Sequence, residues 1–142
     1  CIRDRFGEPN QVKYTANMER GIDTSGILTM DYSGFKAVSI AAKDCAAPAR
    51  YIIQGTKGYI LQKSTANCCG GITFHPNEGK EEHYNLNGDR PRQAAEFEAF
   101  YRAMTTGDQE LCARMLDTSI AVSRVLTVAR RSAGVRFPGD RF

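Results

Sequence analysis

The chain has 142 residues, of which 42% are hydrophobic and 25% charged, and its formal net charge is +3. This length suits one domain with a hydrophobic core of its own, and no apolar run approaches the ~20 residues that a membrane span requires. So mild a positive charge eases contact with an anionic ligand but does not by itself indicate a nucleic-acid-binding protein.

Five cysteines occur, an odd number: Cys1, Cys45, Cys68, Cys69 and Cys112. In a domain of this size they indicate reduced thiols and a cytoplasmic protein, not a disulfide framework. The sequence starts with cysteine instead of methionine, which fits either a processed lipoprotein or a piece of a longer protein, and we expect the piece.

Short β-prone runs fill the first 90 residues. Residues 12–16 alternate apolar and polar side chains, as a half-buried strand does. Residues 27–32 and 35–42 alternate in the same way, and Ser33-Gly34 between them predicts a hairpin. Weaker strand candidates follow at 72–75 and 83–86.

The run YIIQGTKGYI, residues 51–60, contains a lysine between glycines, which raises the question of a phosphate-binding loop. In a Walker loop the lysine follows the second glycine and a helix comes next, whereas here Lys57 precedes Gly58 and another β-prone run follows. The pattern therefore predicts a second hairpin with its turn at residues 55–58.

The last 50 residues are predicted to be helical. One helix starts near Pro91 and carries an apolar stripe to Met104, with Gly107 as its end. Asp108 is the expected N-cap of a second helix, which Gly134 ends. Its stripe runs through Leu111, Met115, Thr118, Val122, either Val125 or Leu126, and Ala129.

Strands followed by helices predict an α+β domain, built on an open, mainly antiparallel sheet with both helices on one face. The uncovered face is not wholly polar, because apolar and small side chains occupy both faces of residues 27–42. A face of this kind usually meets another surface, so we expect self-association into a homo-oligomer.

The residues that could bind a metal or take part in catalysis form only weak patterns. His75 and His83 follow Cys68-Cys69 at spacings that match no zinc module, so no metal site is predicted. Neither cysteine has a local signature of a nucleophile paired with His75. Glu81 and His83 can converge on one face of a strand, although a solvated loop is the preferred interpretation.

Two features bear on nucleotides and nucleic acids. The tail VARRSAGVRFPGDRF is rich in arginine, but the end of a helix accounts for Arg130 and Arg131, and Asp140 dilutes the rest. We therefore predict no nucleic-acid partner. The chain contains no GxGxxG fingerprint for a dinucleotide.

Several stretches, in order, resemble the C-terminal domain of the glucose–fructose oxidoreductase and inositol 2-dehydrogenase family. They are FGEPNQV at 6–12, GID at 21–23, MDYSGFKA at 30–37, IIQGTKGYI at 52–60, EFEAF at 96–100 and SRVLTVARRSAGVRFP at 123–138. Members of this family are NAD(P)-dependent sugar oxidoreductases, and the matching stretches cover most of the chain.

The resemblance implies that a Rossmann domain, absent here, binds the cofactor, and that residues 1–142 form the substrate and oligomerisation domain of a longer, two-domain protein. The family's catalytic lysine lies in a Glu-Lys-Pro motif of that first domain, and no such motif occurs here. We expect no catalytic, cofactor-binding or metal-binding residue in this chain, and NAD or NADP only in the full-length protein.

Two functions remain open at this point. The first is a C-terminal part of an oxidoreductase acting on a sugar, polyol or related alcohol, inactive by itself. The second is a non-catalytic oligomerisation or binding module. For the substrate wall, residue type alone nominates Tyr14, Arg20 and His75.

Overall fold

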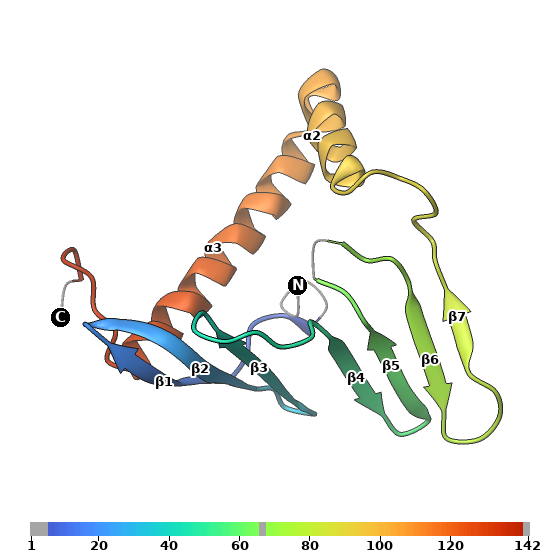
Figure 1. Ribbon diagram of the computed structural model, residues 1–142. Helices are drawn as coiled ribbons and strands as arrows, with labels where there is room; N and C mark the ends of the chain where they lie inside the picture. Colours follow the sequence, from blue (N-terminus) through green and yellow to red (C-terminus); the bar gives the residue numbers. More distant parts are fainter. Residues whose placement is uncertain (1–5, 66–67, 141–142) are drawn as a thin grey trace. The chain divides into compact units, whose positions relative to one another are not determined.

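The computed structural model describes residues 6–65 and 68–140 (Figure 1). By its internal contacts the chain divides into two compact units. The first unit contains the residues up to Ala46 together with those from Asp108 onward, and the second contains Ala47–Gly107. Each unit is described by itself below.

The first unit is built on a three-stranded antiparallel sheet in the order β1-β2-β3. The strands are β1 (Gln11–Glu19), β2 (Ile22–Asp31) and β3 (Lys36–Ala42). The predicted hairpin at Ser33-Gly34 is confirmed, since it joins β2 to β3. Its neighbour, the turn at Arg20-Gly21, joins β1 to β2 with both residues at positive φ.

The two faces of this sheet differ in exposure. On one face Met30 and Tyr32 are buried, and Leu28 is half-buried. On the other face the side chains of Ile27, Val38 and Ile40 are 46%, 58% and 76% exposed. The pairing places Ile27 opposite Ile40, so these apolar groups form one patch, as the mixed pattern of residues 27–42 predicted.

Helix α3 (Gln109–Ser132) belongs to the same unit and contacts β1 (Figure 1). Asp108 is its N-cap, as predicted, and its carboxylate accepts a hydrogen bond from the Leu111 amide at 2.9 Å. The predicted stripe is the covered face of the helix. Of the two alternatives in it, Val125 is half-buried whereas Leu126 is 58% exposed.

The end of α3 is tied to the strand and to the following tail. Ser132 Oγ accepts a hydrogen bond from the Tyr14 amide at 2.8 Å, and this protects a free backbone group of the edge strand β1. Asp140 accepts hydrogen bonds from Arg130, from Arg131 and from the Phe137 amide. Asp140 therefore holds the tail that follows α3 against the end of that helix.

The second unit contains a four-stranded antiparallel sheet in the order β4-β5-β6-β7. Its strands are β4 (Tyr51–Gly55), β5 (Gly58–Gln62), β6 (Ile72–Pro76) and β7 (Glu82–Tyr84). The predicted hairpin turn at residues 55–58 is confirmed. Gly58 is required there, because its φ is +144° and a Cβ would lie 2.2 Å from the carbonyl oxygen of His75.

Helix α2 (Ala94–Thr106) completes the second unit. It begins three residues later than Pro91 predicted, because Gln93 adopts a left-handed conformation (φ 65°) that cannot continue a helix. Its end at Gly107 is as predicted. The apolar stripe of α2 is largely exposed, with Phe97 at 69% and Met104 at 77%.

The fold is thus α+β with open antiparallel sheets, as the sequence predicted, although the strands form two sheets and not one. Within the described residues, neither α2 nor α3 offers a stretch apolar enough to cross a bilayer.

Candidate functional site

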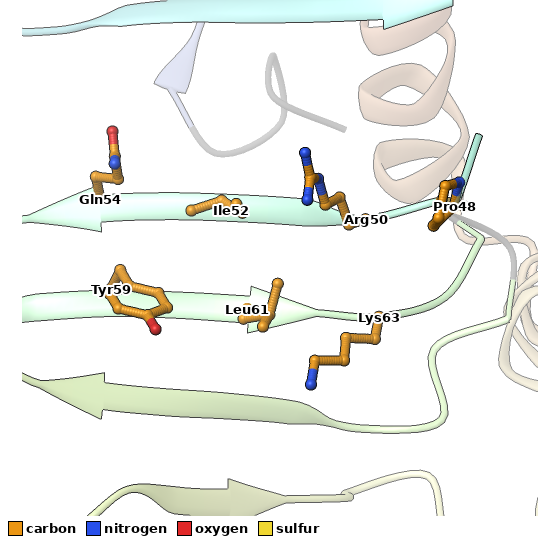
Figure 2. A pocket seen from close by; sticks show the side chains of 8 residues that line it. Pro48, Arg50, Ile52, Gln54, Tyr59, Leu61 and Lys63 are labelled. Carbon is orange, nitrogen blue, oxygen red and sulfur yellow. The ribbon is translucent and has the colours of Figure 1, made fainter.

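A hollow of about 470 Å³ lies on one face of the β4–β5 hairpin (Figure 2). The strand register explains which side chains line it, because Ile52 pairs with Leu61 and Gln54 pairs with Tyr59. Directly paired residues of an antiparallel ladder point to the same face. The lining is completed by Pro48, Ala49, Arg50 and Lys63.

His75 of β6 stands next to this hollow, because it pairs with Tyr59 across the β5–β6 ladder. The two rings stack with their centroids 4.4 Å apart and an interplanar angle of 13°. On its other side, His75 Nδ1 lies 3.0 Å from the Glu81 carboxylate. Glu81 thus fixes the orientation of the His75 ring, and stacking on that ring fixes the orientation of Tyr59.

The second ring nitrogen of His75 is unusual. With the proton of Nδ1 donated to Glu81, Nε2 of a neutral imidazole is an acceptor. Nε2 is fully buried and has no hydrogen-bond partner within the described residues. A buried polar atom without a protein partner is uncommon, and an internal water molecule is its usual partner.

Glu81 lies in the loop between β6 and β7 with its side chain 54% exposed, as the preferred interpretation had it, but its pairing with His75 was not predicted, since only His83 was considered as a partner. The β6–β7 hairpin instead brings Glu81 back beside His75, and His83 Nδ1 lies 3.0 Å from Thr73 Oγ1. The spacing of Glu81 and His75 in the sequence does not reveal that they lie side by side, because the path of the loop 77–81 determines the position of Glu81.

Tyr14 belongs to a polar cluster of the first unit. Its hydroxyl donates to Asp23 Oδ2 at 2.9 Å, and Lys43 Nζ lies 3.3 Å from Asp23 Oδ1. Partial burial and the Asp23 carboxylate raise the pKa of Tyr14, while the Tyr14 hydrogen bond and Lys43 lower the pKa of Asp23. Gly26 leaves room for the phenol ring, since a Cβ there would lie 2.4 Å from Tyr14 Cε2.

Arg20 occupies the β1–β2 turn, where its side chain is 91% exposed and pairs loosely with Glu19 at 3.7 Å. Within the described residues of the first unit, Arg20 forms no hydrogen bond or ion pair with the Tyr14 cluster. Of the three nominated residues, Tyr14 and Arg20 therefore belong to the first unit at different sites, and His75 alone lies beside the hollow of the second.

Sequence reasoning missed the other polar residues of the hollow: Arg50, Gln54, Tyr59 and Lys63. The signal for them was present. Once the turn at residues 55–58 is assigned, two-residue alternation places even-numbered positions of β4 and odd-numbered positions of β5 on a single face.

The described residues contain no group of three or more His, Cys, Asp or Glu side chains placed to hold a metal ion. Cys68 is exposed, and Cys69 Sγ lies 3.9 Å from the Gly71 carbonyl oxygen. His75 is engaged by Glu81 and Tyr59, not by either thiol. Cys1 lies outside the described residues.

Comparison with known proteins shows what the chain is similar to, and the relatives described here are oxidoreductases. It is 25% identical over 137 residues to scyllo-inositol 2-dehydrogenase (NADP(+)) IolU of Bacillus subtilis, which covers 96% of this chain and 42% of that protein. It is 27% identical over 136 residues to the uncharacterized oxidoreductase YgjR of Escherichia coli, covering 95% of this chain and 40% of that protein. The chain thus spans about two fifths of the length of these relatives. No family model matches it.

These similarities run through nearly the whole chain and agree with the ordered motifs found in the sequence. They fit a domain of the glucose–fructose oxidoreductase and inositol 2-dehydrogenase family, which is the family that the chain resembles.

Proposed function

We propose that residues 1–142 are the C-terminal substrate and oligomerisation domain of a longer NAD(P)-dependent oxidoreductase. The observation that carries this proposal is the uneven coverage: the match includes 96% of this chain but 42% of the inositol dehydrogenase. Hydride transfer needs a cofactor held against a substrate carbon. The chain has no dinucleotide fingerprint, so the cofactor belongs to the remaining part of such an enzyme.

The substrate in this proposal is a sugar, a polyol such as an inositol, or a related alcohol. The name of the Bacillus relative supports a polyol and NADP. A role of His75 in the substrate wall is supported by its stacking on Tyr59, which lines the hollow. Tyr14 and Arg20 are proposed for the same wall on residue type alone. The proposed location of the enzyme is the cytoplasm.

The experiment compares the 142-residue chain with the full-length gene product. We expect the full-length protein to oxidise a polyol with NAD or NADP, and the chain alone to show neither turnover nor cofactor binding by calorimetry. Micromolar affinity of the chain for NADPH, or a full-length product with no dinucleotide-binding domain, would contradict the proposal.

The alternative is a non-catalytic oligomerisation or binding module. The exposed apolar patch of the first unit, formed by Ile27, Val38 and Ile40, favours it as a second candidate. In the leading proposal the same patch serves the subunit interface of the enzyme. An independent start codon at the beginning of this chain would favour the module, and an upstream Rossmann segment with Glu-Lys-Pro would favour the enzyme.

Nucleic-acid binding is not proposed. Arg130 and Arg131 of the arginine-rich tail both engage Asp140, which reduces the charge available for phosphates. A salt titration with a DNA duplex tests this, because phosphate binding would weaken steeply with ionic strength.

A further inference from the structure

The hollow on the β4–β5 hairpin has three sections along its length (Figure 2). Arg50 and Lys63 stand at one end, and Gln54 and Tyr59 stand at the other. The middle is apolar, formed by Ile52 and Leu61. Gln54 is four positions after Arg50 along extended chain, so the hollow is about 14 Å long.

Arg50 and Lys63 form an unusual pair of cations. They lie one position beyond the last pair of the β4–β5 ladder, Tyr51 with Gln62, and so face each other across the hairpin. Like charges at opposite positions of an antiparallel pair are destabilising. Figure 2 shows the two charged groups turned away from each other, as such repulsion would favour.

Within the described residues, some cations have acidic partners, as Lys43 has Asp23 and Arg124 has Glu8, but Arg50 and Lys63 have none. An anion bound at this end would relieve the repulsion, and rotation of the two flexible side chains would bring both charged groups into contact with it. This end of the hollow is therefore suited to an oxyanion, either a carboxylate or a phosphate.

The opposite end is suited to a neutral, hydroxylated group. The Tyr59 ring is held in place by stacking on His75. The Tyr59 hydroxyl and the Gln54 amide have no hydrogen-bond partner among the described residues. A rigid aromatic ring with free polar groups beside it can receive the apolar face of a sugar ring while bonding its hydroxyls.

We infer that the β4–β5 hollow binds an elongated small molecule with an oxyanion at one end and a hydroxylated body of about two sugar rings. Its oxyanion lies between Arg50 and Lys63, and its body crosses Ile52 and Leu61 to reach Tyr59 and Gln54. A volume of about 470 Å³ lies within the range of ligand sites. The inference deepens the proposed function, on which it rests for the sugar-like body.

The test is calorimetric titration of the 142-residue chain with three probes that each carry a galactosyl ring on a second six-carbon unit. Lactobionate carries a carboxylate, lactose 1-phosphate carries a phosphate, and lactitol is uncharged. We expect at least one anion to bind about tenfold more tightly than lactitol, with an affinity that falls as ionic strength rises. The anion that binds identifies the headgroup.

Variants assign the site. Arg50→Gln and Lys63→Gln should each weaken binding of the anion about threefold, and the double variant about tenfold, as expected for exposed charge pairs. Arg50→Lys should retain binding, since it keeps the charge. Lys57→Gln, in the turn of the same hairpin, is the matched control and should leave the affinity unchanged.

Equal affinity for lactitol, no heat with either anion, or wild-type affinity in the double variant would overturn the inference. Cover of the hollow by a second copy of the chain would also overturn it, and light scattering would then show that the double variant changes the oligomeric state. No titration involves NAD(P), so failure here is distinct from failure of the proposed function.

Discussion

Replacing Gly58 by alanine tests whether one glycine fixes the hairpin that carries the hollow. The added Cβ would lie 2.2 Å from the His75 carbonyl oxygen and 2.8 Å from the Pro76 Cα. Both neighbours are backbone atoms of β6, so no side-chain rotation can relieve the contact. The backbone φ of +144° is in addition a conformation that an L-residue rarely adopts.

The cost follows from these two terms. Forcing an extra carbon into a packed position costs about 1–3 kcal/mol, and a glycine-only backbone conformation costs about 1–3 kcal/mol. Gly58→Ala should therefore lower the free energy of unfolding by about 2–6 kcal/mol, a large share of the ~5–15 kcal/mol typical of a domain. Because β6 must move away, His75 should also lose its contact with Tyr59.

Gly55 at the other end of the turn is the matched control. A Cβ there would lie 3.6 Å from the Gly58 carbonyl oxygen, an ordinary contact. Gly55→Ala should be neutral or stabilising by about 0.4–1 kcal/mol, because alanine restricts the unfolded chain. Urea denaturation followed by circular dichroism measures both variants. Equal stability of the two would refute the steric argument for Gly58.

Three further predictions concern the first unit. The Arg130 hydrogen bond holds the pKa of Asp140 well below its usual range, so the contribution of Asp140 to stability is present above pH ~4 and is lost as the pH falls below it. Asp140→Asn should remove this part of the acid dependence in denaturation curves. An unchanged pH profile would contradict the stabilising role of the Asp140 hydrogen bonds. Gly26→Ala should lower the free energy of unfolding by about 1 kcal/mol in the wild type, because the Tyr14 ring is displaced, but by little in a Tyr14→Ala background. Additive effects in this double-mutant cycle would show that the ring is not the obstacle. Ile40→Lys should reduce self-association through the exposed patch, measured by light scattering at high concentration; a wild type that is strictly monomeric would contradict the expected interface.

Local sequence signals predicted the local structure well. The turn at residues 55–58 and the caps at Gly107 and Asp108 were found because each depends on the backbone of a few adjacent residues. The period of the stripe on α3 likewise follows from helix geometry alone. Val125 and Leu126 are one position apart, however, and only the folded structure shows that Val125 is half-buried while Leu126 is exposed.

The candidate site was less accessible to sequence reasoning. His75 was nominated by residue type, but its partners Glu81 and Tyr59 come from a loop and from another strand. The cationic pair Arg50 and Lys63 is likewise separated along the chain and adjacent only across a ladder. Such pairs depend on strand register and on the path of loops, which hydrophobic periodicity does not specify.

The sequence by itself determined the α+β class, most element positions and the resemblance to a sugar oxidoreductase domain, because periodicity, caps, turns and ordered motifs are properties of neighbouring residues. Tertiary structure alone decided that the strands form two sheets, that Asp140 holds the tail against α3, and that one hairpin face has a hollow with two cations that lack an acidic partner in the described part of the chain. These features arise from contacts between distant residues, whose free energy depends on how the whole chain folds.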